Sequence, residues 1–328
     1  MAVAASAPDT RARLAERLRL LAPVLVLIGL CVIVGVLNPN FASLSNAIRV
    51  LTAAAVPMVL ALGATFVILI GGVDLSVEGV MALGAIILSL LVANDVGTTG
   101  FGLLAIPVAM LAGLVMGTIN GVIHVGLRIP SFMVTLGSWF VGLGLAAVML
   151  GGVTIRILDP TIRALSLTRF LELPLLVWIA ALALAVAYVI QSHTRFGRYV
   201  FAVGGGEDLA ALSGVPVGRI KVMVFALAGA FYGLASTMAA AQLGQGNATI
   251  GDGRLFTTIT AVVVGGTSLS GGQGGVLNTL IGVLIVAVLA NGMILLGISP
   301  YIQQTVQGLM IIAAVALSLD RVRLRIVK

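Results

Sequence analysis

Apolar runs of about 20 residues recur along the whole chain, and they constrain its fold more than any other feature. A run of that length forms an α-helix that can cross a hydrocarbon core roughly 30 Å thick. The sequence lacks the alternating pattern of the strands of a membrane β-barrel. Of its 328 residues, 60% are hydrophobic and only 9% are charged, whereas a soluble domain carries roughly 25% charged residues. The chain is therefore predicted to be an all-α integral membrane protein, a polytopic helical bundle.

About ten transmembrane helices are predicted from these runs. The expected spans are residues 20–37, 51–70, 75–93, 101–125, 130–150, 173–190, 222–243, 256–264, 275–296 and 302–319. A short segment on the membrane surface is expected at 41–50. The first run is long and lacks a cleavage site of small residues, so it is expected to remain as an anchor.

Basic residues indicate the orientation of the chain. They gather before the first span and after the last, at Arg11, Arg13, Arg17, Arg19, Arg321, Arg323, Arg325 and Lys328. Under the positive-inside rule, residues 1–19 and 321–328 are then cytoplasmic ends of a permease domain at 20–320. These clusters explain the pI near 10.5 without a nucleic-acid partner. Against the rule, Arg156, Arg163 and Arg169 would lie in an external loop.

One polar segment, residues 194–221, separates the sixth span from the seventh and is expected to be a cytoplasmic loop. Its central residues predict a short helix with acidic residues at the positive end and a glycine stop: Gly206, Glu207, Asp208, Leu209, Ala210, Leu212, Ser213 and Gly214. A helix of two turns is marginal alone in water. Its leucine face is expected to dock in a groove of a soluble partner, or else to lie on the protein's own surface.

Two glycine-containing segments resemble each other and each opens an apolar run, GGVDLS at 71–76 and GGTSLS at 265–270. Both predict broken helices, and irregular backbone at membrane depth is tolerated where protein or a water-filled cavity satisfies it. Such interruptions in matching positions indicate a transport pathway; the alternative is close packing of helices at small residues. The candidate pathway or gate residues are Gly71, Gly72, Asp74, Ser76, Glu78, Gly265, Gly266, Ser268 and Ser270.

Two carboxylates stand out within the first of these segments. Asp74 and Glu78 are four residues apart, a spacing that predicts one helical face, and no Lys or Arg is close in sequence. A charge at the bilayer centre costs about 2.5–3.5 kcal/mol on insertion scales. Asp74 is expected to cap the helix that follows it, and Glu78 to face the lumen or a gate. Proton coupling through the pair, as in a secondary transporter, is the alternative.

Catalytic motifs are absent from the sequence. Residues 269–273 read LSGGQ, as in ABC ATPases, but neither lysine, Lys221 or Lys328, belongs to a phosphate-binding P-loop. The chain has two histidines, His124 and His193, and one cysteine, Cys31, with no HExxH, CxxC or GxSxG motif. We expect no enzymatic activity, no metal and no cofactor bound by this chain itself.

Four stretches together resemble the inner-membrane permease of ribose-type carbohydrate ABC importers. They are the whole segment 194–221, GGVDLSVEGVMALGA at 71–85, TAVVVGGTSLSGGQGGVLNTLIG at 260–282 and NGMILLGISPYIQQTVQGLMIIAAV at 291–315. The resemblance extends from about residue 39 to residue 320. The chain departs from the family pattern at Glu78, where a small residue is common, and at Gln273, where a basic one often occurs.

The resemblance implies a transport subunit of a bacterial inner membrane that works as a pair, expected here as a homodimer. Its partners would be an ATPase with two nucleotide-binding cassettes, which binds ATP and Mg, and a periplasmic or extracellular sugar-binding protein. The segment 194–221 would be the coupling element on the ATPase. The implied cargo is a ribose-like pentose or related sugar; nucleosides, branched-chain amino acids or a furanone signal are the alternatives.

Overall fold

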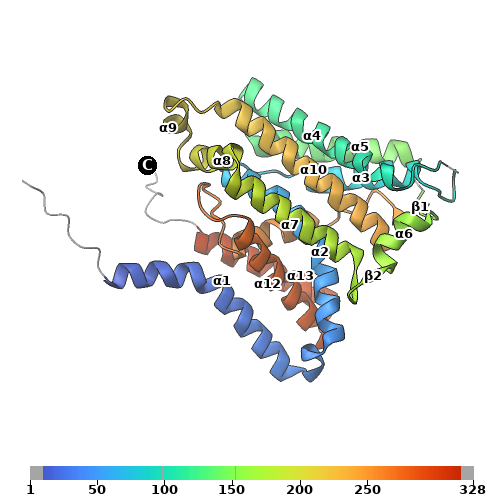
Figure 1. The fold of residues 1–328 in the computed structure, drawn as a ribbon, viewed down its shortest axis with the longest axis horizontal. Helices are drawn as coiled ribbons and strands as arrows, with labels where there is room; N and C mark the ends of the chain where they lie inside the picture. The colour runs from blue at the N-terminus through green and yellow to red at the C-terminus, as the bar shows by residue number, and fades with distance from the viewer. Residues whose placement is uncertain (1–9, 98, 152, 319–328) are drawn as a thin grey trace, which may run out of the picture.

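The computed structural model is almost entirely α-helical and describes residues 10–97, 99–151 and 153–318 (Figure 1). Its long helices are α1 (Thr10–Leu37), α2 (Leu44–Leu69), α4 (Ala105–Leu127), α5 (Ser131–Leu150), α7 (Leu175–His193), α10 (Val217–Leu243), α12 (Val276–Leu295) and α13 (Pro300–Ser318). The shorter ones are α3 (Val77–Leu91), α6 (Pro160–Leu167), α8 (Arg195–Gly205), α9 (Glu207–Leu212), α11 (Arg254–Val264) and the 3-10 turns η1 (Pro39–Ala42) and η2 (Gly102–Leu104). The basic tail predicted at 321–328 lies outside the described residues.

Four two-residue strands join loops at the end of the bundle opposite α8 and α9 (Figure 1). The first sheet pairs β1 (Ile155–Arg156) with β4 (Gln245–Gly246), with Ile155 opposite Gly246. The second is a hairpin of β2 (Arg169–Phe170) and β3 (Leu173–Pro174). The charge pattern predicts that this end of the bundle is external. Helices α8 and α9 lie at the opposite end, which is predicted to be cytoplasmic.

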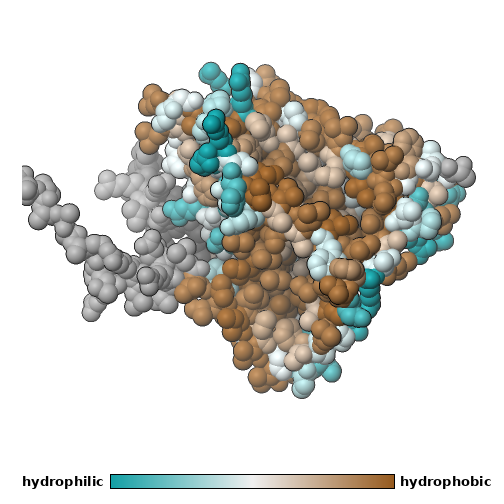
Figure 2. Space-filling view, viewed as in Figure 1, coloured by the Kyte–Doolittle hydropathy of each residue, from teal (hydrophilic) through white to brown (hydrophobic). Residues whose placement is uncertain are grey.

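Among the described residues, six helices are long and apolar enough to cross a membrane: α2, α4 with η2, α5, α7, α10 and α12. The apolar part of α1 from Leu21, the short helices α3 and α11, and α13 correspond to the other predicted crossings. Figure 2 shows a brown belt of hydrophobic side chains between two regions richer in teal, one near α8 and one at the opposite end. The prediction of a polytopic helical bundle is confirmed.

Some boundaries differ from those predicted. Helix α2 begins at Leu44 because the hydroxyl of Ser43 accepts the Asn46 amide, so most of the surface segment predicted at 41–50 belongs to a membrane helix. Helix α1 begins at Thr10, within the segment predicted to precede the first span.

Helices α2 and α10 form the centre of the bundle. The most apolar window of α2 is 78% buried and that of α10 is 67% buried, whereas the windows of α5 and α7 are only 22% buried. The outer helices expose many large apolar side chains, among them Phe140, Val148 and Leu182. Such side chains suit a hydrocarbon solvent, in which every backbone polar group is bonded within its own helix.

Glycines allow α4 and α10 to approach until their backbones touch. A Cβ atom on Gly229 would meet the backbone of Gly113, and one on Gly117 would meet the carbonyl oxygen of Phe225. Hydrocarbon supplies no hydrophobic driving force between helices, so close backbone packing of this kind holds membrane helices together.

Replacing Gly117 by valine should therefore weaken the bundle. The added atoms overlap backbone that cannot move independently, and overpacking costs about 1–3 kcal/mol. We expect a lower melting temperature of the detergent-solubilised protein. Gly137→Val in α5, where no atom lies within 4 Å of the added Cβ, is the matched control. Equal melting temperatures for the two variants would contradict the packing described.

Candidate translocation and coupling site

Both glycine segments break the helices, as predicted. Helix α2 ends at Leu69 and α3 begins at Val77, while α11 ends at Val264 and α12 begins at Val276. Gly71 and Gly266 adopt φ angles of 74° and 99°, which L-residues with a side chain rarely adopt.

Side chains of α5 satisfy the extended backbone of the first break. The amide of Val73 donates to the hydroxyl of Ser131 at 3.1 Å, and the amide of Leu75 donates to that of Thr135 at 2.9 Å. Residues 73–75, which carry these bonds, are not helical, so Asp74 precedes α3 instead of belonging to it. The expectation that Asp74 and Glu78 share one helical face was therefore wrong.

Asp74 belongs to a buried polar cluster. Its Oδ1 accepts the amide of Ser76 at 2.8 Å and the hydroxyl of Ser76 at 2.6 Å, and Asn120 of α4 donates to the same hydroxyl at 3.3 Å. The other carboxylate oxygen, Oδ2, and the hydroxyl of Tyr232 from α10 are both buried without a hydrogen-bond partner in the part of the chain that the structure describes. Asp74 thus stabilises the turn before α3; it does not bind the amides of the first helical turn, as the capping prediction required.

Glu78 caps a different helix from the one that carries it. Its Oε1 accepts the amide of Leu255 at 3.2 Å, in the first turn of α11, and only 5% of Glu78 is exposed. The N-cap of α11, Gly253, has no side chain to cap the helix itself. The N-termini of α3 and α11 both lie at this carboxylate, and the positive ends of two helix dipoles stabilise a negative charge there.

The lengths of the two helices indicate that these N-termini meet inside the membrane. Helix α3 has 15 residues and α11 has 11, which at 1.5 Å per residue gives about 22 Å and 16 Å, each less than a core of roughly 30 Å. The chain just before α11 exposes polar groups at this depth, including Thr249 and Asp252. An exposed carboxylate at membrane depth faces water or protein, because hydrocarbon cannot solvate it.

A groove adjoins this segment. It has a volume of about 350 Å³, is formed by α11, α12 and α13, and begins at Gly253. Thr257, Thr260, Gln304 and Gln307 supply its polar groups, and the other lining side chains are apolar. This volume is typical of small-molecule sites. The sequence did not predict this polar wall, which consists of Asp252 and the polar groove residues, although an acidic residue four positions before the span predicted at 256–264 was a signal.

The candidate coupling segment, residues 194–221, contains the short helix that was predicted. Glu207 and Asp208 occupy the first turn of α9, and Gly214, with a φ angle of 80°, follows its end. Ala210 is buried, whereas Leu209 is 71% exposed and Leu212 is 86% exposed. The alternative in which the leucine face lies on the protein's own surface is therefore wrong.

The coupling segment and the two glycine breaks touch one another through backbone atoms. The amide of Gly272 donates to the carbonyl oxygen of Leu69 at 2.9 Å. A Cβ atom on Gly204, near the end of α8, would overlap both of these groups. Gly71 lies against the carbonyl of Ser270. A displacement of α8 thus reaches both breaks directly, without an intervening side chain.

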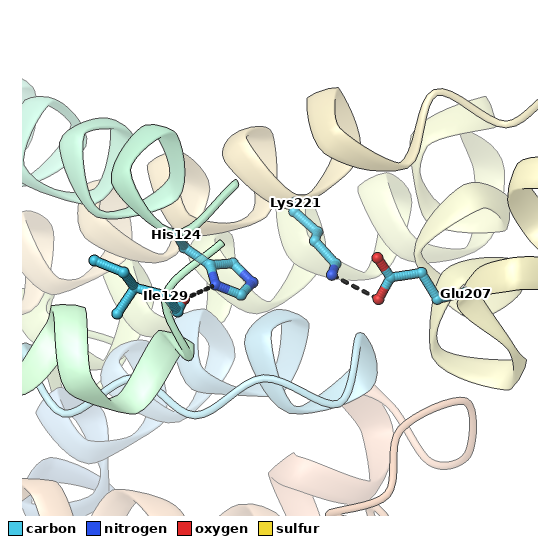
Figure 3. Close-up of polar contacts among 4 residues, drawn as sticks. All are labelled: His124, Ile129, Glu207 and Lys221. Carbon is cyan, nitrogen blue, oxygen red and sulfur yellow. Dashed lines mark hydrogen bonds and ion pairs between the residues drawn. The ribbon is translucent and has the colours of Figure 1, made fainter. Parts of the chain in front are cut away.

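One ion pair is found among the described residues, and it fastens α9 to α10 (Figure 3). Lys221 Nζ and Glu207 Oε2 are 2.6 Å apart, and the lysine side chain is 15% exposed. Beside this pair, His124 Nδ1 lies 2.6 Å from the carbonyl oxygen of Ile129, so the imidazole closes the turn between α4 and α5.

A membrane bundle with two opposed half-helices and a short helix that exposes leucines at one end is typical of a transport permease. The family model described as "Branched-chain amino acid transport system / permease component" matches residues 46–315. The chain belongs to this permease family. It is a multi-pass membrane protein and a transport subunit.

Similar curated proteins are named as sugar permeases. The ribose import permease RbsC of Haemophilus influenzae is 38% identical over 89% of this chain and 90% of its own length. The RbsC protein of Escherichia coli K12 is 37% identical, covering 93% and 94%. The galactose/methyl galactoside import permease MglC of Escherichia coli K12 is 33% identical, covering 89% and 91%. No solved structure matches the chain.

The long-range cap on α11 predicts different effects for two substitutions of Glu78. Glu78→Ala removes the acceptor and should lower stability by about 1 kcal/mol, as loss of an N-cap does. Glu78→Gln keeps an oxygen acceptor and should retain most of the stability, as measured by thermal unfolding in detergent. If the melting temperatures of the two variants are equal and well below that of the unchanged protein, the carboxylate charge rather than the cap holds α11.

Transport by Glu78→Gln at every pH would also eliminate proton coupling.

Proposed function

We propose that this chain is the membrane permease subunit of an ABC importer and conducts a ribose-like pentose or related sugar. The names of the aligned relatives support the sugar class, since ribose and galactose permeases match about nine tenths of the chain. The observation that carries the proposal is the exposed leucine face of α9, attached to a bundle that has no P-loop in its sequence.

A soluble ATPase is the partner that this face fits. Leu209 and Leu212 expose 71% and 86% of their surface on a helix of only six residues. A groove that received both side chains would stabilise a helix too short to be stable alone. We propose that the groove belongs to a tandem-cassette ATPase, which binds ATP and Mg and supplies the driving energy. This assignment places α9 and both termini in the cytoplasm.

ATP binding would then act on the two broken helices. When the ATPase shifts α9, the Glu207–Lys221 pair transmits the movement to α10, and the contact of Gly204 with Leu69 and Gly272 transmits it to the breaks. Moving a two-state equilibrium from 1:99 to 99:1 needs about 5.5 kcal/mol of differential binding. The partner would supply that energy, and the bundle of this chain would adopt the two conformations.

The passage itself would lie along the polar wall at α11, between this chain and a second copy. Asp252 and the groove residues Thr257, Gln304 and Gln307 offer acceptors and donors for sugar hydroxyl groups. The glycine breaks, with Ser76, Gly265, Ser268 and Ser270, would border its inner part. A sugar-binding protein would deliver the cargo at the opposite end from α9, and would determine which sugar enters.

Purification of the tagged chain from its native membrane in mild detergent tests the ATPase assignment. A tandem-cassette ATPase should copurify with the unchanged chain and be lost from Leu212→Asp, because a carboxylate cannot enter an apolar groove without losing its hydration. Leu243→Asp is the control, since Leu243 is also exposed but lies at the other end of α10.

Glu207→Lys should uncouple ATP hydrolysis from uptake, because it sets two positive charges together at Lys221. The exchange Glu207→Lys with Lys221→Glu should restore part of the coupling.

Retention of the ATPase by Leu212→Asp with normal uptake would refute the coupling role of α9.

Uptake by the reconstituted importer tests the cargo. Vesicles containing the permease, its ATPase and its binding protein should accumulate labelled ribose when ATP is present, and excess unlabelled pentose should compete. Leucine is the most informative competing solute to compare with pentose, since the family description names branched-chain amino acids. Competition by leucine but not by pentose would overturn the sugar assignment, and uptake without ATP would overturn the importer assignment.

A further inference from the structure

The hairpin of β2 and β3 has an unusual turn. Its two turn residues, Leu171 and Glu172, both adopt left-handed φ angles, of 49° and 65°. Two-residue hairpin turns of this kind favour Asn-Gly, because most side chains are strained there. The leucine is nevertheless 71% exposed, so burial in its own protein does not offset the strain. Strained residues persist where the surroundings or a function require them.

The hairpin is fastened to the first turn of α7. The indole nitrogen of Trp178 donates to the carbonyl oxygen of Phe170 at 3.1 Å. Their rings meet edge to face, with centroids 5.5 Å apart and an angle of 66°. Phe170 remains 57% exposed beside Leu171. The hairpin therefore presents two adjacent apolar side chains from a rigid base.

This apolar tip continues a lipid-facing stripe. The large exposed side chains of α7 between Trp178 and Val189 lie along one helical face and are apolar or aromatic: Trp178, Leu182, Val186, Tyr188 and Val189. The exposed polar residues of α7, Ser192 and His193, lie at its other end. Only 22% of the residues in the most apolar 18-residue stretch of α7 are buried. An apolar face without exposed charge is suited to hydrocarbon, unlike the segment just before α11, which exposes Asp252. Trp178 occupies the end of this stripe, where membrane proteins place tryptophan at the headgroup level.

We infer that the tip of this hairpin, Phe170 and Leu171, is an anchor that inserts into the lipid headgroup region at the end of the bundle opposite α9 (Figure 1). Phe170 and Leu171 enter the apolar boundary, while the neighbouring Arg169 and Glu172 remain among polar headgroups. The bilayer thereby buries the leucine that the protein leaves exposed. This surface is independent of the proposed sugar transport, because it involves neither the groove nor α9.

Site-specific labelling tests the anchor. The chain has a single cysteine, so a Cys31→Ser background accepts one new cysteine at a time. Leu171→Cys would carry an environment-sensitive fluorophore in the full-length protein, reconstituted into vesicles with lipids brominated high on the acyl chain. Leu209→Cys on α9 is the matched control, because Leu209 is also a leucine that is 71% exposed.

The label at position 171 should lose most of its fluorescence with brominated lipid and resist iodide added to the water. The label at position 209 should behave in the opposite way. Equal quenching by iodide at both positions would overturn the anchor. A label at 171 that neither bromine nor iodide quenches would also overturn it, and would indicate a protein contact, with a second copy or an external partner.

A second variant separates insertion from turn geometry. Leu171→Asn with Glu172→Gly provides the residues that the turn favours, and should preserve the hairpin while removing its apolar tip. With Trp139→Phe in the same chain, Trp178 is the only tryptophan. We expect Trp178 to become more accessible to acrylamide in vesicles than it is with Leu171 in place. An unchanged accessibility would show that the leucine does not hold the hairpin in the bilayer.

Discussion

The interior of a membrane supplies no water to form hydrogen bonds with free backbone groups. Each broken helix therefore depends on protein side chains that take the place of water. The hydroxyls of Ser131 and Thr135 bind the extended amides before α3, and the carboxylate of Glu78 binds the first turn of α11. Without these acceptors the chain could not stop and restart a helix at this depth. Because α3 and α11 are half-helices, a polar wall can form beside α11. The passage that we propose depends on this polar wall.

Glycine provides the second constraint, because it determines where backbones touch. At Gly204, Leu69 and Gly272 the coupling segment meets both breaks with no side chain between them. Contacts of this kind are stiff, since interiors are closely packed and do not deform continuously. The polar wall and the coupling helix lie on different parts of the bundle, yet the same breaks connect them.

The two ends of the bundle contrast with each other. At α9 two leucines are exposed on a helix that a soluble protein would cover, whereas at the β2–β3 hairpin an exposed leucine continues the apolar face of α7. Exposure alone does not distinguish these two surfaces. Their surroundings do: the leucines of α9 share their helix with Glu207 and Asp208, whereas the hairpin lies against Trp178 and the apolar stripe of α7.

The sequence by itself determined the fold class, the crossings, the positions of both breaks and the extent of α9, because hydrophobic run length, glycine pairs and helix caps act between residues close in the chain. It misjudged the carboxylates: Asp74 and Glu78 were expected on one helical face, but hydroxyls of α5, about 60 residues away, hold Asp74 outside the helix. Only the tertiary structure brought Glu78 to Leu255, 177 residues apart, and exposed the wall around Asp252. Which carboxylate caps which helix depends on contacts between distant segments, and those contacts follow from how the whole bundle satisfies its backbone.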